Sequence, residues 1–227
     1  MRLSEKIKIH FNEIVWSRSI NFALHRLCLI ATRRLGWTLL GSEEPIKPYM
    51  VPLNNGCFVD VGANYGVWTS FVAKEGFTVH AFEPSPRPYK HLTKNALLNV
   101  HTYNVALGDK EAVAELNLHE ASGHNSLLRK AKDFTGKTVK VQVKTLDSFK
   151  LENVGLIKID TEGYEVPILL GARQTMLRWK PRLVIEVHSP IREQVIIITG
   201  ILRNMGYAII TKHKIGTYQP MLIGEPM

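Results

Sequence analysis

Cysteine is scarce in this sequence. Its 227 residues include only Cys28 and Cys57, which are too few for a disulfide framework and form no metal-binding cysteine motif. Cys57 begins an apolar run, so we expect it to be a buried thiol. This cysteine usage fits a reducing, intracellular compartment, and we therefore expect a cytoplasmic protein.

Long apolar runs are also missing. No stretch reaches the roughly 18 apolar residues that indicate a membrane-spanning helix. Residues 20–40 come nearest, but Arg26 and Arg33 interrupt them. The N-terminus does not resemble a signal peptide, because Glu5 and Glu13 interrupt it and no long apolar core follows the first charges.

Acidic residues are outnumbered by basic ones, 20 against 29, which gives a formal net charge of +9. Such a surface favours anionic partners such as nucleic acid, acidic lipid headgroups or phosphorylated compounds. A solvated basic surface explains the charge equally well. No feature of the sequence indicates an oligomeric state.

Residues 1–40 have a helical pattern and a basic character. Ile7, Phe11, Leu24 and Leu27 belong to apolar stripes at helical spacing. We expect a pair of helices that pack on the main domain. The alternative is a basic amphipathic anchor that makes peripheral contact with an acidic membrane or with a partner.

A connector rich in turn-forming residues follows this segment. Pro45, Pro48 and Pro52 precede Asn54-Asn55-Gly56. We predict that residues 1–50 form a basic helical extension with its connector, and that residues 51–227 form a single domain.

From Cys57 onward the pattern alternates between strands and helices, which predicts an α/β fold with a mostly parallel, doubly wound sheet. The expected strands are 57–61, 78–82, 102–106, 155–160 and 182–187, the expected helices are 65–74, 87–99, 166–177 and 191–205, and strands 207–211 and 218–223 close the sheet as a hairpin. Residues 113–118 and 138–143 alternate as antiparallel strands do.

The turn after the first strand carries the strongest motif. Asp60, Gly62 and Gly66 give the pattern D-x-G-x-x-x-G. In the dinucleotide fingerprint G-x-G-x-x-G a pyrophosphate rests on a helix N-terminus. Asp60 replaces the first of those glycines, and its carboxylate would repel a pyrophosphate but could hold the ammonium group of a methionine moiety. The motif therefore favours S-adenosylmethionine over a nicotinamide dinucleotide.

Two later strand ends fit the same ligand. Glu83 follows Asp60 by 23 residues, and an acidic residue about 20 residues on can accept hydrogen bonds from ribose hydroxyls. The segment Asn104–Asp109, which includes Ala106, ends the third strand and can line an adenine pocket. A plain turn at Gly108 explains that segment nearly as well.

The fourth strand ends in a concentration of carboxylates. Asp160, Glu162 and Glu165 lie within six residues and should face solvent or a polar cleft. Asp160 is a candidate for substrate or cofactor contact. The alternative is that these residues cap the following helix and complement its dipole, and we expect that role for Glu165.

The fifth strand ends in Glu186-Val187-His188, so Glu186 and His188 lie on the same side of the sheet. A histidine can act as a general base near neutral pH. We take His188 as the first candidate base and Asp160 as the second. Alternatively Asp160, Glu162 and Glu186 could hold Mg²⁺ through oxygen ligands.

The polar loop at 120–136 could lie over the acceptor, with His124 reaching the site, or could be a hairpin tip. Basic residues at its end could guide an anionic acceptor; they are Arg129, Lys130, Lys132 and Lys137.

Taken together, these segments resemble the FkbM-type methyltransferase family. The resemblance covers about residues 56–190 and is carried by Val59–Gly66, Phe82-Glu83-Pro84, Asn104–Asp109 and Lys158–Glu165. It implies a class I methyltransferase fold, S-adenosylmethionine as cofactor, and O-methylation of a hydroxyl on a sugar, a glycan or lipid-linked compound, or a natural product.

The resemblance also implies site residues. The implied cofactor contacts are Asp60, Gly62, Ala63, Asn64, Tyr65, Gly66, Glu83, Pro84 and Ala106, and the implied residues of the methyl-transfer site are His188, Asp160 and Glu162. No metal ligand is among them.

Two rival functions stay open. An RNA ribose methyltransferase would suit the charge, although the chain lacks an Asn-Pro-Pro-Tyr motif and a cysteine near the fourth or fifth strand. A non-catalytic module that binds S-adenosylmethionine could share the fold.

Overall fold

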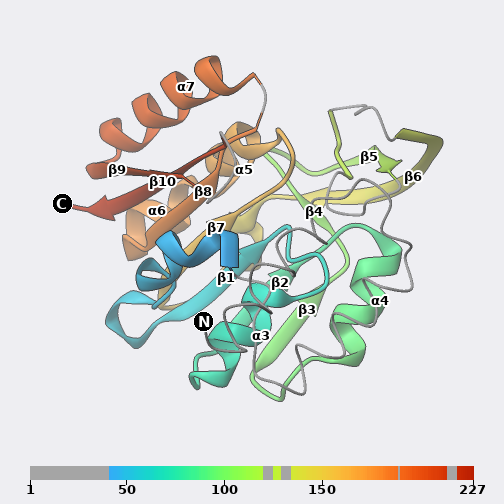
Figure 1. Ribbon diagram of the computed structural model, residues 1–227, viewed down its shortest axis with the longest axis horizontal. Helices are drawn as coiled ribbons and strands as arrows, with labels where there is room; N and C mark the ends of the chain where they lie inside the picture. Colours follow the sequence, from blue (N-terminus) through green and yellow to red (C-terminus); the bar gives the residue numbers. More distant parts are fainter. Residues whose placement is uncertain (1–40, 120–124, 129–133, 189, 214–218) are drawn as a thin grey trace, which may run out of the picture. The chain divides into compact units, whose positions relative to one another are not determined.

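The computed structural model describes residues 41–119, 125–128, 134–188, 190–213 and 219–227 (Figure 1). Residues 42–227 form one compact unit. The predicted helices and membrane contact of residues 1–40 lie outside the described residues and stay predictions. The predicted domain boundary at residue 50 also stays a prediction.

A seven-stranded sheet in the order β3-β2-β1-β7-β8-β10-β9 forms the centre of this unit (Figure 1). Its strands are β1 (Cys57–Val61), β2 (Val79–Phe82), β3 (Val100–Tyr103), β7 (Val154–Ile159), β8 (Arg182–Glu186), β9 (Tyr207–His213) and β10 (Pro220–Pro226). The first five strands in the sheet order run parallel, and β10 is antiparallel to both β8 and β9. The predicted mostly parallel sheet with a closing antiparallel hairpin is confirmed.

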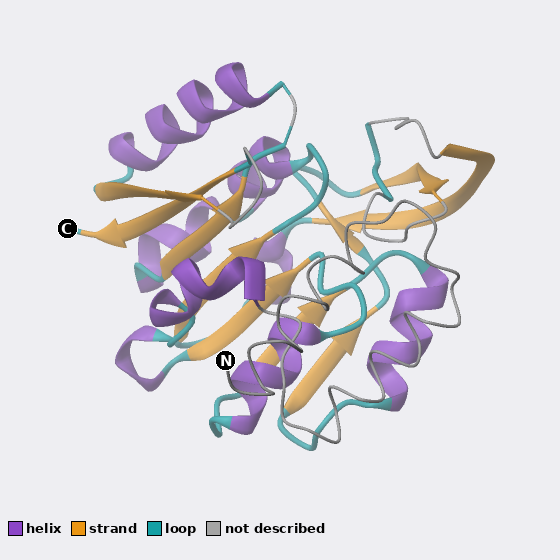
Figure 2. Cartoon of the chain, viewed as in Figure 1, coloured by secondary structure: helices purple, strands orange, loops and turns teal. Residues whose placement is uncertain are grey.

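Helices surround this sheet (Figure 2). They are α3 (Val67–Lys74), α4 (Pro86–Lys94), α5 (Glu165–Gly171), α6 (Arg173–Trp179) and α7 (Ile191–Asn204). Val59 and Val61 of β1 belong to the apolar cluster that includes residues of α5, α6 and α7. Asp60 points to the opposite face, because side chains alternate along a strand, and there it meets Thr69 of α3. Helices therefore cover both faces.

A small second sheet lies between β3 and β7 in the sequence. It has the order β4-β6-β5, with β4 (Ala106–Leu107), β5 (Ala112–His119) and β6 (Phe134–Lys144). The predicted antiparallel pair is confirmed, since Leu116 of β5 pairs with Val139 of β6. The expected strand 102–106 is wrong in one respect, because β3 ends at Tyr103 and Ala106 already belongs to the second sheet.

Two predicted helices differ in length from those observed. The expected helix 87–99 ends at Lys94, where the Asn95 side chain bonds back to the carbonyl of His91. The expected helix 166–177 is two helices, α5 and α6, which meet at Ala172. Helical periodicity continues across this break, so the sequence pattern did not reveal it.

The expected connector is in part structured and packed on the sheet. Gly41–Tyr49 forms a 3-10 helix, η1, and Leu53–Asn55 another, η2. Ile46 and Met50 are each only 1% exposed, and Arg182 of β8 donates a hydrogen bond of 3.1 Å to the carbonyl of Val51. Among the described residues, no helix is both long and apolar enough to span a bilayer.

Candidate active site

A cavity of about 340 Å³ lies at the carboxyl ends of the central strands. This is where open α/β sheets bind ligands, and the volume lies in the range of about 300–1,000 Å³ that is usual for small-molecule sites. The cavity is lined by Val61, Gly62, Asn64, Phe82, Glu83, Pro84, Val105, Ala106, Leu107, Leu116, Asn125, Leu127, Asp160, Thr161, Glu162, Tyr164, Ile168, Glu186 and Gln219.

The turn between β1 and α3 depends on its glycines. Gly62 has a φ of +79° and Gly66 a φ of +82°, in the left-handed region that glycine adopts without strain. A Cβ at Gly62 would collide with the backbone carbonyl oxygen of Asp160. Gly62 therefore allows the β1 turn to pack directly against the end of β7. The residues of the β1 turn and those that follow β7 consequently lie close together.

Glu83 is held in the cavity wall by two backbone donors. The N–H of Asn64 donates to Oε2 at 2.8 Å and the N–H of Ser85 donates to Oε1 at 2.7 Å. Burial raises the pKa of Glu83 to about 7, the two backbone hydrogen bonds oppose this rise, and the charges of Asp60 and Asp160 add to it. Each carboxylate oxygen keeps a further lone pair for a ligand hydroxyl.

Asp60 lies under the site and is not one of the cavity-lining residues. It is 1% exposed, and the Thr69 hydroxyl donates to its Oδ2 at 2.6 Å. Its Oδ1 has no hydrogen-bond partner among the described residues. Burial raises its pKa, while the positive charge of Lys158 opposes the rise. Asp60 thus brings buried negative potential and one unused acceptor to the β1 turn.

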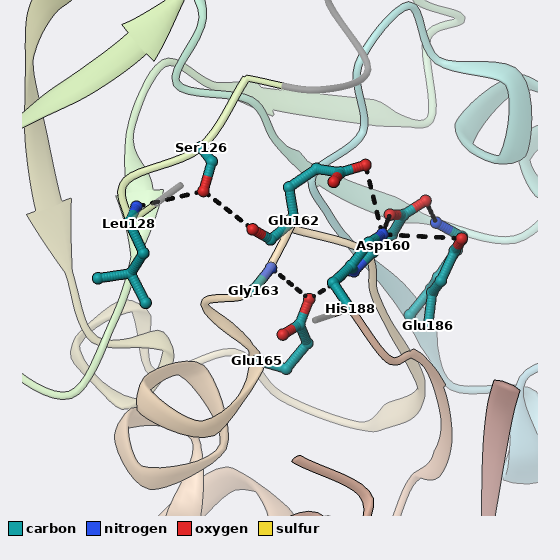
Figure 3. A network of polar contacts seen from close by, with 9 residues as sticks. Ser126, Leu128, Asp160, Glu162, Gly163, Glu165, Glu186 and His188 are labelled. Carbon is teal, nitrogen blue, oxygen red and sulfur yellow. Dashed lines mark hydrogen bonds and ion pairs between the residues drawn. The ribbon is translucent and has the colours of Figure 1, made fainter. Parts of the chain in front are cut away.

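His188 lies in the middle of a group of four carboxylates (Figure 3). Its Nδ1 is 2.8 Å from Oε1 of Glu165. Its Nε2 is 3.3 Å from a carboxylate oxygen of Glu162, 3.7 Å from one of Glu186 and 3.8 Å from one of Asp160. The ring is 1% exposed, so these contacts are shielded from water.

This environment fixes the charge of His188. Burial lowers its pKa, but hydrogen bonds to Glu162 and Glu165 and the charge of Asp160 outweigh that effect and raise the pKa to about 10. The imidazole is therefore protonated at neutral pH, and both ring nitrogens act as donors. A ring in this state has no lone pair with which to take a proton from an acceptor.

Asp160 lies between two cations. The ammonium group of Lys158, whose side chain is 3% exposed, is 2.9 Å from Oδ2 of Asp160, and His188 faces Oδ1. The Asp160 side chain is 26% exposed and lines the cavity. Of the carboxylates around His188, it combines cavity access with the most direct cationic support.

A family model, the methyltransferase FkbM domain, matches residues 60–209, which is more than half of the chain and includes the strand ends described above. The chain belongs to this family. The predicted family is confirmed, and with it the class of enzyme, a methyltransferase.

Individual relatives with methyltransferase names agree with this assignment. The chain is 27% identical over 190 residues to the 31-O-demethyl-FK506 methyltransferase FkbM of Streptomyces tacrolimicus, covering 67% of this chain and 73% of the relative. It is 29% identical over 142 residues to Methyltransferase 1 of Beauveria bassiana (strain ARSEF 2860). That match covers 50% of this chain and 57% of the relative.

A solved structure supports the fold. The crystal structure of methyltransferase FkbM from Methylobacillus flagellatus KT aligns with a TM-score of 0.55 at 20% identity, over 74% of this chain. The alignment covers 43% of that longer chain, so this chain corresponds to less than half of it. The predicted class I methyltransferase fold is confirmed.

The FkbM-type fold brings most of the predicted site residues together. Those that line the cavity are Gly62, Asn64, Glu83, Pro84, Ala106, Asp160 and Glu162. Asp60, Ala63, Tyr65, Gly66 and His188 are not among the lining residues. The Tyr65 ring packs edge-on against His91, with 5.2 Å between ring centroids. The roles of all these residues stay predictions.

Several lining residues were missed in the sequence. Leu116 and Leu127 come from the small sheet and its connection, and Gln219 precedes β10. Asn125 lies in the loop that was expected over the acceptor, and it lines the cavity. His124, Arg129, Lys130 and Lys132 fall outside the described residues, and Lys137 is exposed on β6.

Proposed function

We propose that this FkbM-type chain is an S-adenosylmethionine-dependent O-methyltransferase. The observation that carries the proposal is one cavity that joins Glu83, at the end of β2, to Asp160, Glu162 and Glu186, at the ends of β7 and β8. A buried acceptor suited to a ribose and a carboxylate group suited to a hydroxyl thus face the same space. The relative named as a 31-O-demethyl-FK506 methyltransferase supports oxygen as the methylated atom.

The residues present fit the proposed cofactor. When bound, S-adenosylmethionine supplies a methyl group that is already activated on a sulfonium. Glu83 accepts from the ribose hydroxyls, and its orientation is fixed by Asn64 and Ser85. Ala106 lines the same cavity and would contact the adenine. Asp60, buried beneath the β1 turn with an unused Oδ1, would favour the positively charged ammonium group through its negative potential.

Asp160 is the proposed general base. A carboxylate oxygen of Asp160 would take the proton of the acceptor hydroxyl in a transfer that breaks the methyl–sulfur bond as the methyl–oxygen bond forms, leaving a neutral thioether. His188 does not serve as the base, because its pKa of about 10 leaves it protonated. Instead its positive charge, with that of Lys158, holds the neighbouring carboxylates in place.

The acceptor end of the cavity favours a neutral polyhydroxyl compound. Asp160, Glu162 and Glu186 present carboxylates, which accept hydrogen bonds from hydroxyls and repel an anion. A sugar, a glycan or lipid-linked sugar, or a hydroxylated natural product fits this chemistry better than the anionic acceptor that the net charge suggests.

The proposal includes no metal ion. Asp160, Glu186 and His188 offer ligand atoms within 4.8 Å of one another. However, Lys158 and the protonated His188 already supply positive charge to this group, and the comparisons with known proteins give no support for Mg²⁺.

Cofactor binding tests the first half of the proposal. Isothermal calorimetry with S-adenosylmethionine should show binding by the wild-type chain and at least about tenfold weaker binding by Glu83→Ala, because the ribose loses charged hydrogen bonds. Glu115→Ala, which removes an exposed carboxylate of β5, is the matched control. No wild-type binding at millimolar cofactor would refute the proposal.

Methyl transfer tests the second half. The chain is incubated with methyl-labelled S-adenosylmethionine and fractionated cell extract, and the labelled fraction identifies the acceptor. Asp160→Asn should lower the labelling rate by about 100-fold or more, with cofactor affinity within about threefold of wild type. Label in RNA would favour the ribose methyltransferase, and binding without label in any fraction would favour the non-catalytic module.

A further inference from the structure

The connection between β5 and β6 reaches the active site at two neighbouring residues, Asn125 and Ser126. Asn125 and Leu127 of this connection line the cavity, together with Leu116 of β5. The side chains of Asn125 and Ser126 do not end within the small sheet. Each one bonds to a different strand end of the central sheet.

Asn125 connects the small sheet to the cofactor end. Its Oδ1 accepts from the backbone N–H of His119 at 2.8 Å, at the end of β5. Its Nδ2 donates to the hydroxyl of Ser85 at 2.9 Å, and the backbone N–H of Ser85 in turn donates to Glu83. A side chain fixed at both ends therefore positions the residue that orients the Glu83 carboxylate.

Ser126 connects the same sheet to the methyl-transfer end. Its backbone exchanges two hydrogen bonds with Asn117 of β5, of 2.9 and 3.3 Å, and the residue is 1% exposed. Its hydroxyl donates to the backbone carbonyl of Glu162 at 2.9 Å (Figure 3). Glu162 has a φ of +56°, a conformation that non-glycine residues keep only when their surroundings impose it.

We propose that Asn125 and Ser126 are positioning residues of the active site. Asn125 sets the cofactor end through Ser85, and Ser126 sets the methyl-transfer end through the main chain of Glu162. The small sheet is then the element that fixes the spacing between the two ends. The assignment of the ends rests on the proposed function, whereas the two contacts do not.

Hydrogen–deuterium exchange of the full chain without cofactor reads out each contact. Ser126→Ala should increase exchange at least about threefold in peptides covering residues 160–165 and leave those covering 83–87 unchanged. Asn125→Ala should give the reverse pattern. Thr135→Ala is the control, because the Thr135 hydroxyl also donates to a backbone carbonyl of the small sheet, that of Leu118, but at an exposed position.

Calorimetry separates the roles further. Asn125→Ala should raise the Kd for S-adenosylmethionine by about three- to tenfold, the effect of one hydrogen bond, while Ser126→Ala should leave it within twofold. Ser85→Ala keeps the backbone donor to Glu83 and loses only the hydroxyl, so it should reproduce Asn125→Ala, and the double variant should be no weaker than either single one.

Wild-type exchange in both segments, or the same loosening of both segments by either variant, would overturn the proposal. If Asn125→Ala does not fold, Ser85→Ala carries the same test of the cofactor end. If Ser126→Ala does not fold, Ser126→Cys, which keeps a weak donor, tests the methyl-transfer end. Absent cofactor binding by the wild-type chain would refute the proposed function but leave the exchange result intact.

Discussion

His188 illustrates, at the scale of single residues, how surroundings change the chemistry that a residue type suggests. Its position at the end of the fifth parallel strand is visible in the sequence, and so is its alignment with Glu186. The convergence of Glu162 and Glu165 on the same ring is not, because it depends on the path of the β7–α5 turn. Residue type suggests a base, whereas these contacts raise the pKa of His188 to about 10 and favour the protonated ring.

Removing this cation should destabilise the fold. His188→Ala removes the cation that Asp160, Glu162, Glu165 and Glu186 share, and removing one partner of a buried ion pair costs about 3–5 kcal/mol. Urea unfolding at pH 7 should show this loss in the free energy of unfolding. His213→Ala, at an exposed position of β9, should change it by less than about 0.5 kcal/mol.

The same contact predicts a dependence of stability on pH. The pKa of His188 is raised from 6.5 to about 10, so the stabilisation is complete below pH 6.5 and is lost as the pH rises through 10. The free energy of unfolding of the wild type should fall between pH 7 and pH 10 more steeply than that of His188→Gln. Parallel profiles for the two proteins would contradict the charged state.

Glu83 predicts a second pH effect, on binding instead of stability. With a pKa of about 7, it is mostly protonated at pH 6 and then loses acceptor capacity for ribose hydroxyls. The Kd for S-adenosylmethionine should therefore rise several-fold as the pH falls from 8 to 6. Calorimetry at several pH values measures this, and Glu83→Gln should flatten the profile while weakening binding at pH 8.

At the scale of secondary structure, apolar character predicted the buried elements and failed where tertiary contacts decide. β1 and β8 read as apolar runs and match the expected positions closely. The break at Ala172 coincides with a close contact that the pattern does not show. There Gly171 lies so close to Gly108 that a Cβ would collide with the Gly108 carbonyl oxygen, and no periodicity carries that information.

This close approach gives a prediction for α5. Gly171→Ala should lower the free energy of unfolding by about 1–3 kcal/mol, because Gly108, directly after β4, would have to move to make room for the added Cβ. Gly200→Ala in α7 is the matched control, since nothing lies within 4 Å of its added Cβ, and it should stabilise by about 0.5–1 kcal/mol. Chemical denaturation of both variants measures the difference. Equal effects would show that the contact at Gly171 can relax.

At the scale of the whole molecule, the rule that ligands bind at the carboxyl ends of parallel strands predicts a site at the β1 turn, Glu83 and Asp160, and residues of all three line the cavity. The rule does not predict the cavity-lining residues that come from outside the parallel strands. Leu116, Asn125 and Gln219 reach the cavity only because the small sheet and the closing hairpin fold over the strand ends. Their contributions are set by contacts between residues far apart in the sequence, which spacing does not encode.

The start of the folded unit is also a whole-molecule property. Although residues up to 50 read as extension and connector, Ile46 and Met50 are buried, and Arg182 bonds to the carbonyl of Val51. A chain of residues 42–227, which keeps these contacts, should therefore fold and resist urea better than a chain of residues 51–227. A chain of residues 51–227 loses two buried apolar side chains, each worth about 2–5 kcal/mol, and should unfold at much lower urea or fail to fold. Equal stability of the two truncated chains would instead support a boundary at residue 50.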